Sequence, residues 1–155
     1  MMRFALLLFL MLCAPVFARA DGHVPLTRAF EAMRAGDWTT ARTIASDVSP
    51  VAYDLIEWHR LRGGIGTAEE VMLFLDLNPD WPGLDWLRRK SEPSMLDATD
   101  ADVLLFFRDE LPQSAQGALA HARALKASGQ GGSAEAGLVL AWRSMAIGPQ
   151  MHARM

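Results

Sequence analysis

The amino-acid sequence predicts an all-α fold, an α-solenoid or superhelix built from short antiparallel helix pairs. Between positions 21 and 155 there are 20 Ala and 16 Leu but only 6 Val and 4 Ile. Ala and Leu favour helix, whereas β-branched residues favour strands. Apolar residues recur at helical spacing in successive segments. No Asn-Gly or Asp-Gly pair lies between alternating apolar runs, which argues against β-hairpins.

The first twenty residues differ from the rest and contain the three parts of a secretory signal peptide. Arg3 precedes an unbroken apolar run from Phe4 to Ala14, and Ala18-Arg19-Ala20 forms a small-x-small cleavage site. The apolar run is too short to remain as a bilayer-spanning anchor. We therefore expect residues 1–20 to be removed on export to the periplasm. Residues 21–155 are then expected to form the helical domain, with no membrane anchor.

The composition of the expected mature chain excludes several classes of function. Removal of residues 1–20 leaves 13 basic and 18 acidic residues, a formal net charge of −5, so nucleic acid is not an expected partner. Cys13 is the single cysteine and is lost with the leader, and Leu12 stands where lipidation needs a small residue. A disulfide framework, a Cys-ligated metal and a Cys nucleophile are therefore excluded.

Five helices are expected in the first half of the domain, because each has a start or stop residue at its ends. Ser, Thr and Asp accept hydrogen bonds from the free N–H groups of a first turn, Pro is tolerated there, and Gly ends a helix. The expected helices are, in order, Pro25 to Ala35 before Gly36; a helix capped by Asp37 and carrying Trp38, Ala41, Ile44 and Ala45; Ser49-Pro50 to Arg62 before Gly63-Gly64; a helix behind a Thr67/Glu70 capping box and ended by Asn78-Pro79; and Pro82 to Arg89.

Three further helices are expected in the second half of the domain. The later helices are one capped by Asp100 that runs to Phe107 and stops near Leu111-Pro112, Ser114 to Ser128, and one capped by Ser133 that runs to Met145. Runs 71–75 and 103–107 resemble buried strands when taken alone, but their caps and neighbours favour helix.

The helix over 50–62 has two apolar faces, which predicts neighbours on both sides, as in a solenoid. The two faces are Ala52, Leu55 and Ile56, and Val51, Trp58 and Leu61. The core is expected to contain Leu55, Trp58, Phe74, Trp86, Leu104, Leu119 and Trp142.

No residue is predicted to be catalytic, cofactor-binding or metal-binding. The four histidines lie far apart in the sequence, and His59, which follows Trp58 on a helix with two apolar faces, is expected to be a packing or boundary residue. Gly63-Gly64-Ile65-Gly66 follows no strand and is expected to stop a helix rather than to hold a phosphate. The histidines are His23, His59, His121 and His152.

The carboxylates are candidates for glycoside chemistry, which needs only one or two of them. Those considered are Asp54, Glu57, Glu69, Glu70, Asp76, Asp80 and Asp85, and their neighbouring cations are Arg60, Arg62, Arg88 and Arg89. Capping, solvation or pairing with arginine explains each of them. The five tryptophans are expected in the core, with stacking against sugars as the alternative.

Several stretches of the mature chain occur in the same order and spacing in a known family. They are Gly36-Asp37-Trp38 with Ala41; Asp54-Leu55-Ile56-Glu57-Trp58-His59-Arg60-Leu61-Arg62; Phe74-Leu75; Asn78-Pro79-Asp80-Trp81-Pro82; Leu87-Arg88-Arg89; Pro112-Gln113-Ser114; Gly117-Ala118; and Ala141-Trp142. With this series the chain resembles the N-terminal superhelical region of soluble lytic murein transglycosylases. The resemblance covers nearly all of the mature chain, and its most specific piece is the FLDLNPDWPGL block at 74–84.

The resemblance implies a non-catalytic part in peptidoglycan turnover. In that family the helical stack forms much of a ring, and a separate C-terminal lysozyme-like domain carries a catalytic Glu followed by Ser and a Gly-Leu-Met-Gln type segment. Neither motif occurs in this sequence, so no catalytic residue is carried over. Glycan strands or a protein are the partners that the resemblance implies, no cofactor is expected, and the chain alone is not expected to cleave peptidoglycan.

Three hypotheses about function therefore remain open. The first is the helical part of a lytic transglycosylase without its active domain. The second is a stand-alone periplasmic helical-repeat module that binds protein or peptidoglycan as a scaffold. The third is an unrelated all-α secreted protein.

Overall fold

The computed structural model describes residues 23–145, and the regular structure in this range is entirely helical, which confirms the all-α prediction. The elements are α1 (His23–Arg34), α2 (Trp38–Val48), α3 (Pro50–Arg62), α4 (Ala68–Leu77), α5 (Leu84–Ser91), the 3₁₀ helix η1 (Glu92–Leu96), α6 (Asp100–Phe106), α7 (Ala115–Ala127) and α8 (Gly131–Ser144). The apolar runs 71–75 and 103–107 are helical, as expected. The expected leader, residues 1–20, and both ends of the expected mature domain lie outside the described residues.

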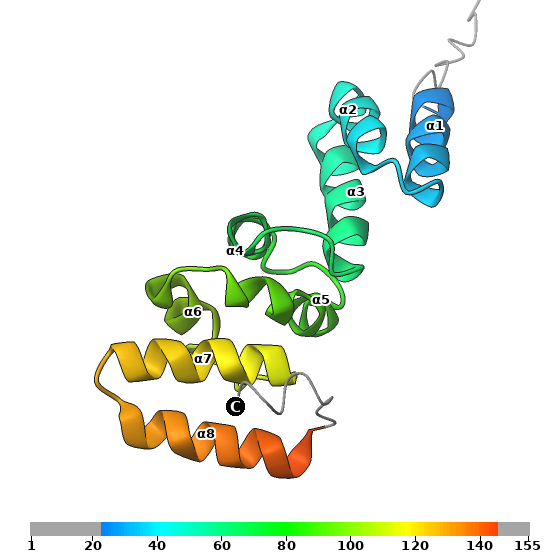
Figure 1. The fold of residues 1–155 in the computed structure, drawn as a ribbon. Helices are drawn as coiled ribbons and strands as arrows, with labels where there is room; N and C mark the ends of the chain where they lie inside the picture. Colours follow the sequence, from blue (N-terminus) through cyan, green and yellow to red (C-terminus); the bar gives the residue numbers. More distant parts are fainter. Residues whose placement is uncertain (1–22, 146–155) are drawn as a thin grey trace, which may run out of the picture.

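The helices pack mainly on their neighbours in the sequence, and the chain runs from α1 at one end of the molecule to α8 at the other (Figure 1). Helix α1 packs on α2, α2 on α3, α6 on α7 and α7 on α8. Helix α3 also contacts α5, and α7 also contacts η1, so some contacts form between elements that do not follow one another directly. This packing is consistent with a solenoid of helix pairs.

Four of the expected helix starts are confirmed by their cap hydrogen bonds. The side chains of Asp37, Ser49 and Ser114 each accept a bond from the backbone N–H three residues further on. Thr67 and Glu70 form the expected capping box, with each side chain bonded to the other residue's backbone N–H. Each cap satisfies donors that a first helical turn leaves without a partner.

The expected start of the fifth helix at Pro82 is wrong, and the segment after that helix was not expected. Helix α5 begins at Leu84 because Gly83, with φ of 67°, turns the chain through the left-handed region. After Ser91 the chain continues as the short helix η1, with Pro93 in its first turn. Because Pro lacks an N–H, it suits a first turn but cannot continue the ladder of α5.

The expected caps Asp100 and Ser133 are also wrong, by one and by three residues. Thr99 caps α6, because its hydroxyl accepts the N–H of Asp102, and Asp100 is the first residue of the helix. Helix α8 begins at Gly131, with Gln130 at the N-cap position. The two glycines of the first turn therefore lie inside the helix rather than in the loop before it.

The core consists of two clusters, one in α1–α3 and one in α3–α7. The first cluster is built largely from small residues: Ala29, Ala41, Ala45, Ala52 and Ile56. The second is built from larger ones: Leu61, Val71, Phe74, Leu87, Met95, Val103, Phe106, Phe107, Ala120 and Ala124. Larger side chains that are only partly buried, among them Phe30, Met33 and Trp38, pack around the first cluster.

The predicted core list is only partly confirmed. Phe74 is buried, and Leu55, Trp58, Leu104 and Leu119 are half-buried. Trp86 and Trp142 were expected in the core, which is wrong: they are 46% and 60% exposed. The reason is the contact face of each helix, because α5 packs through Leu87 and α8 packs through Ala134 and Ala141. Val51 of the second expected apolar face of α3 is exposed as well, and only Trp58 and Leu61 of that face pack inward.

Candidate functional site

The FLDLNPDWPGL block forms the corner between α4 and α5 and fastens it to α3. The buried Asn78 donates from Nδ2 to the carbonyl oxygen of Phe74 at 3.1 Å, and the N–H of Trp81 donates to the carbonyl of Asn78 at 3.2 Å. The indole Nε1 of Trp58 on α3 donates to the carbonyl of Pro82 at 2.9 Å. The most specific part of the sequence therefore holds a structural corner.

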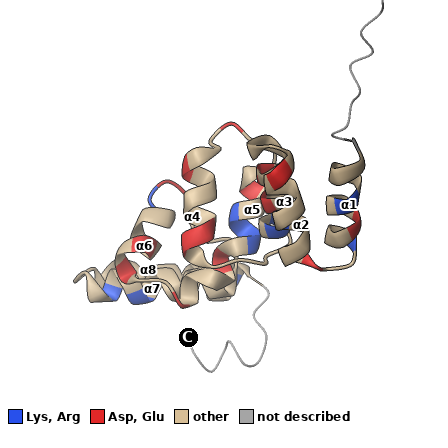
Figure 2. Cartoon of the chain, turned by 90° about the horizontal axis from the view of Figure 1, so that it is seen from above, with Lys and Arg blue, Asp and Glu red and all other residues tan. Residues whose placement is uncertain are grey.

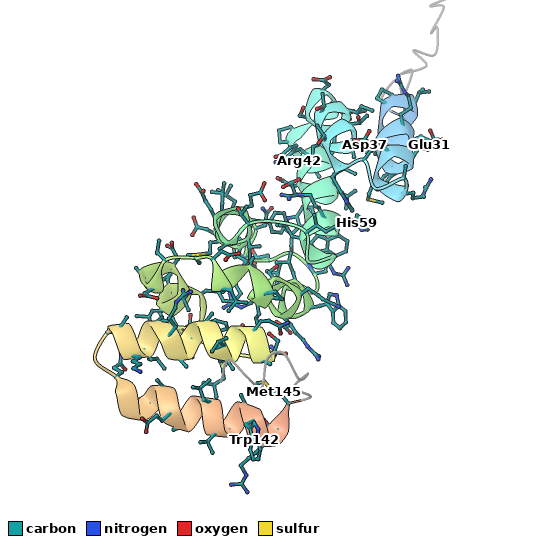
Figure 3. The ribbon with its side chains drawn as sticks, viewed as in Figure 1. Glu31, Asp37, Arg42, His59, Trp142 and Met145 are labelled. Carbon is teal, nitrogen blue, oxygen red and sulfur yellow. The ribbon has the colours of Figure 1, made fainter. Side chains whose placement is uncertain are left out.

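Aromatic rings continue this corner toward α1. Edge-on and tilted contacts, with ring centres 4.8 to 6.3 Å apart, link Phe30, His59, Trp58, Trp81 and Phe74. The guanidinium of Arg62 lies 4.3 Å from the ring centre of Trp58. His59, labelled on α3 in Figure 3, has its pKa lowered by burial and by the nearby charge of Arg62. These groups pack against one another, so they form part of the framework.

The carboxylates of α3 and α4 form an ion-pair network with two arginines. Arg60 Nη2 lies 2.6 Å from Glu57 Oε2, and Arg42 Nε lies 2.8 Å from Glu57 Oε1. Both arginines also approach Glu70, Arg60 at 3.1 Å and Arg42 at 3.7 Å. Burial alone would raise the pKa of Glu70, but hydrogen bonds from Arg60 and from the Thr67 backbone lower it. The network therefore joins α2, α3 and α4. Within it, the lowered pKa keeps Glu70 in the ionised form.

Glu92 is a buried carboxylate that the sequence analysis did not single out. Its Oε1 accepts the N–H of Gln113 at 2.7 Å, and its Oε2 accepts both the N–H of Ser114, at 2.7 Å, and the hydroxyl of that residue. Burial raises the pKa of Glu92 in spite of these bonds and of the charge on Arg89. A side chain at Gly117 would collide with the Glu92 carboxylate.

Glu92 therefore fastens η1 to the start of α7 from inside the protein. Its two oxygens are occupied by protein donors, and only 2% of the residue is exposed. No local pattern could have found it, because its partners lie 21 and 22 residues further along the chain.

The remaining candidates lie apart from one another. Glu69, Asp76, Asp80 and Asp85 are exposed, and Asp54 is half-buried. His121 lies on α7, 5.1 Å from the ring centre of Phe107, and burial lowers its pKa. The side chain of His23 and all of His152 lie outside what the structure describes. Within residues 23–145 no group of three or more His, Cys, Asp or Glu could hold a metal ion.

A groove of about 440 Å³ lies where α5, η1, the start of α7 and the end of α8 meet. Its lining includes Trp86, Arg89 and Lys90 from α5, and Gln113 and Gln116 from the start of α7 and the segment before it. Lys90 Nζ lies 5.0 Å from the ring centre of Trp86, which is 46% exposed. Figure 2 shows the basic residues of α5 gathered near the middle of the molecule. The groove thus combines an indole face, two cations and neutral amide groups.

The two cations of this groove differ from the arginine beside them. Arg88 forms an ion pair with Glu110, at 3.3 Å, and donates to the carbonyl of Phe106. Among the residues that the structure describes, no carboxylate forms a salt bridge with Arg89 or Lys90. Both are exposed, so their charges remain available to a ligand. We take this groove as the candidate binding site.

Sequence reasoning missed the groove although one indication was present. Trp86, Arg89 and Lys90 stand at i, i+3 and i+4, which places them on one face of a helix. From the sequence Trp86 is expected in the core, so an exposed indole beside these two cations is not among the expectations. The contributions of Gln113 and Gln116 depend on how α7 packs beside α5, which no local pattern shows.

A second concavity of about 620 Å³ lies between α7 and α8 and is lined mainly by apolar side chains, with His121 as its one titratable group. A mainly apolar concavity with a few polar groups suits an apolar small molecule. A charged or strongly polar ligand finds more partners in the groove on α5.

The described part of the chain is all-helical and carries a groove lined by basic and aromatic side chains. Comparison of the chain with family models, curated proteins and solved structures found no match. None of the described helices has both the length and the apolar composition that crossing a bilayer requires.

Proposed function

We propose that this chain is a non-catalytic helical module of the periplasm that binds peptidoglycan, as the resemblance to lytic murein transglycosylases implies. The observation that carries the proposal is the groove of Trp86, Arg89 and Lys90. Peptidoglycan offers sugar rings, whose C–H faces stack on an indole, and stem peptides that carry carboxylates. Arginine and lysine bind carboxylates through charge-assisted hydrogen bonds. The groove volume of about 440 Å³ suits a segment of a few sugar units.

Catalysis by the chain itself is not part of the proposal. Cleavage of a glycosidic bond needs an acid next to the scissile oxygen, in a groove that holds the glycan. Among the described carboxylates, Glu92 has the raised pKa of such an acid, but it is enclosed by Gln113, Ser114 and Gly117. Glu57 and Glu70 are held by arginines. The module therefore supports a partner or a glycan strand and leaves the chemistry to another domain.

Co-sedimentation of the purified exported protein with murein sacculi tests this function. The wild type is expected to pellet with sacculi, and Trp86→Ala or the double variant Arg89→Ala/Lys90→Ala is expected to reduce the bound fraction at least fivefold. The matched control is Arg28→Ala/Arg34→Ala, which removes the same charge from the exposed face of α1. No anhydro-muropeptides should appear above background in the same incubations.

Equal binding by all four proteins would overturn the assignment of the groove. No binding by the wild type would favour the alternative function, a scaffold for a protein partner. Release of anhydro-muropeptides that disappears on substitution of a single carboxylate of this chain would contradict the non-catalytic role.

A further inference from the structure

Glu92 lies at the base of the candidate groove, between its two walls. One wall is α5, which carries Arg89 and Lys90 and continues without a loop into η1, where Glu92 is the first residue. The other wall is the segment 113–116, at and just before the start of α7. Pro93, next to Glu92, also lines the groove, whereas Glu92 itself is only 2% exposed. The buried carboxylate therefore stands where the two walls meet.

The carboxylate of Glu92 holds the second wall in place. Its Oε1 accepts the N–H of Gln113 and its Oε2 accepts the N–H of Ser114, both at 2.7 Å. The hydroxyl of Ser114 in turn accepts the N–H of Gly117 at 3.1 Å and so caps α7, the helix that carries Gln116. A Cβ at Gly117 would lie 2.2 Å from Oε2 of Glu92, so this close approach needs a residue without a side chain. The position of both groove glutamines relative to α5 therefore depends on Glu92.

Glu92 also faces one of the two cations of the groove. Burial is the largest influence on the pKa of Glu92 and raises it, and the positive charge of Arg89 on α5 acts in the opposite direction. An ionised Glu92 therefore attracts Arg89 and weakens the attraction of Arg89 for an anion in the groove. At the start of α7 the groups that face Glu92 are Ser114 and Gly117, which do not titrate in this range. Other titratable side chains of α5 and α7 have partners elsewhere: Arg88 with Glu110, Lys90 with the ring of Trp86, Arg123 with Asp100, and His121 with the ring of Phe107.

We propose that Glu92 is a positioning residue for the groove: it holds the segment 113–116 against α5 and, through Arg89, sets how strongly the groove binds the carboxylates of a peptidoglycan stem peptide. The inference rests on the proposed function and adds the part of the ligand that the cations recognise. A proton on Glu92 removes the negative charge that competes with the ligand for Arg89. An anion bound to Arg89 stabilises the protonated form of Glu92 by the same amount, so binding takes up protons.

The sign of the expected pH dependence follows from these charges. The folded-state pKa of Glu92 lies above its ordinary value of 4.5. The carboxylates of an exposed stem peptide have ordinary pKa values of about 4, so they stay ionised above about pH 5. Binding of a stem peptide therefore strengthens as pH falls through the folded-state pKa of Glu92 and weakens as pH rises through it. A ligand without carboxylates should not show this change.

Calorimetric titration of the purified protein with a soluble muropeptide between about pH 5 and pH 8 tests the inference. The wild type is expected to bind about threefold to fivefold more tightly at the low end, the size of one partly screened charge interaction. The heat of binding should depend on the ionisation enthalpy of the buffer, because protons are taken up. The same muropeptide with its carboxylates amidated should bind more weakly, with no strengthening at low pH. Glu92→Gln should abolish the pH dependence, and the control Glu31→Gln, at an exposed position on α1, should keep it.

Ser114→Ala gives a second readout that keeps Glu92 in the protein. The hydrogen bond from the Ser114 hydroxyl lowers the pKa of Glu92, so its removal raises that pKa further. The midpoint of the pH profile of muropeptide binding should therefore move to higher pH. Ser114 also caps α7, so circular dichroism checks that each variant is folded.

The outcomes separate this inference from the proposed function. A wild type that binds neither muropeptide at any pH would overturn both. Binding without pH dependence, or a pH dependence that Glu92→Gln retains, would overturn the role of Glu92 and leave peptidoglycan binding in place. An unmoved midpoint in Ser114→Ala would overturn that role equally, and it decides the matter if Glu92→Gln does not fold. Equal strengthening of the acidic and the amidated muropeptide at low pH would show that the stem-peptide carboxylates are not what Arg89 recognises.

Discussion

Two regions of the molecule each bury a glutamate, and they satisfy it in different ways. In the α2–α4 region, Glu57 lies between the guanidinium groups of Arg42 and Arg60. In the η1–α7 region, Glu92 accepts two backbone N–H groups and one hydroxyl, and no salt bridge to a described cation accompanies it. On burial the carboxylate of Glu57 loses its hydrating water and gains two positive charges. The carboxylate of Glu92 loses its water and gains neutral hydrogen-bond donors.

The two regions favour different protonation states of their carboxyl groups. Glu70, in the arginine network, has a lowered pKa, because hydrogen bonds and nearby positive charge outweigh its burial. Glu92 has a raised pKa because the neutral donors do not outweigh its deeper burial. A buried carboxylate is therefore insufficient to identify an acid catalyst, since Glu92 has the pKa direction of one and no access for a substrate.

The largest expected effect comes from breaking the arginine network. Glu57→Ala removes the closest partner of Arg60, which is itself buried, and leaves a guanidinium without full compensation. Loss of one partner from a buried ion pair costs about 3–5 kcal/mol. We expect the free energy of unfolding in urea to fall by about this amount. Asp54→Ala on the same helix is the control and should change it by less than about 0.5 kcal/mol.

A smaller effect is expected where Glu92 meets α7. Gly117→Ala places a methyl group against the Glu92 carboxylate, and overpacking of this kind costs about 1–3 kcal/mol. The matched change Gly137→Ala, in the open on α8, should leave stability unchanged or raise it by up to about 1 kcal/mol, because Ala favours helix. Equal effects of the two substitutions on the thermal midpoint would show that the contact with Glu92 is unimportant.

The smallest effect is a difference in pH dependence between the two regions. The folded-state pKa of Glu92 lies above its ordinary value of 4.5, so its contribution to stability is present below pH 4.5 and is lost as pH rises through the folded pKa. The folded-state pKa of Glu70 lies below 4.5, so its contribution is present above pH 4.5 and is lost as pH falls. Thermal midpoints of wild type, Glu92→Gln and Glu70→Gln from pH 3 to 8 check both signs. Glu92→Gln should remove the loss of stability as pH rises through the folded pKa of Glu92 and keep the loss at low pH. Glu70→Gln should remove the loss of stability at low pH and keep the loss as pH rises.

Much of the fold could be predicted from sequence because helix starts are local. Asp37, Ser49, Thr67 and Ser114 cap helices through hydrogen bonds that span three residues, and such patterns are visible in the sequence. The start at Gly83 was missed because it depends on a left-handed backbone conformation rather than on a capping side chain.

Properties that depend on packing could not be predicted in the same way. Trp86 and Trp142 look like core residues by composition, but α5 and α8 turn other residues toward their neighbours. The candidate groove and Glu92 follow from the approach of α7 to α5 and η1, which is set by residues more than twenty positions apart.

Binding of peptidoglycan by the groove on α5 is tested most directly by an NMR titration of the indole N–H resonances with soluble muropeptides. We expect the Trp86 resonance to shift in a saturable way. Those of Trp58 and Trp81, whose rings pack in the α3–α5 corner, should stay in place. Shifts confined to Trp58 or Trp81, or no shift of Trp86 at saturating muropeptide, would contradict the claim.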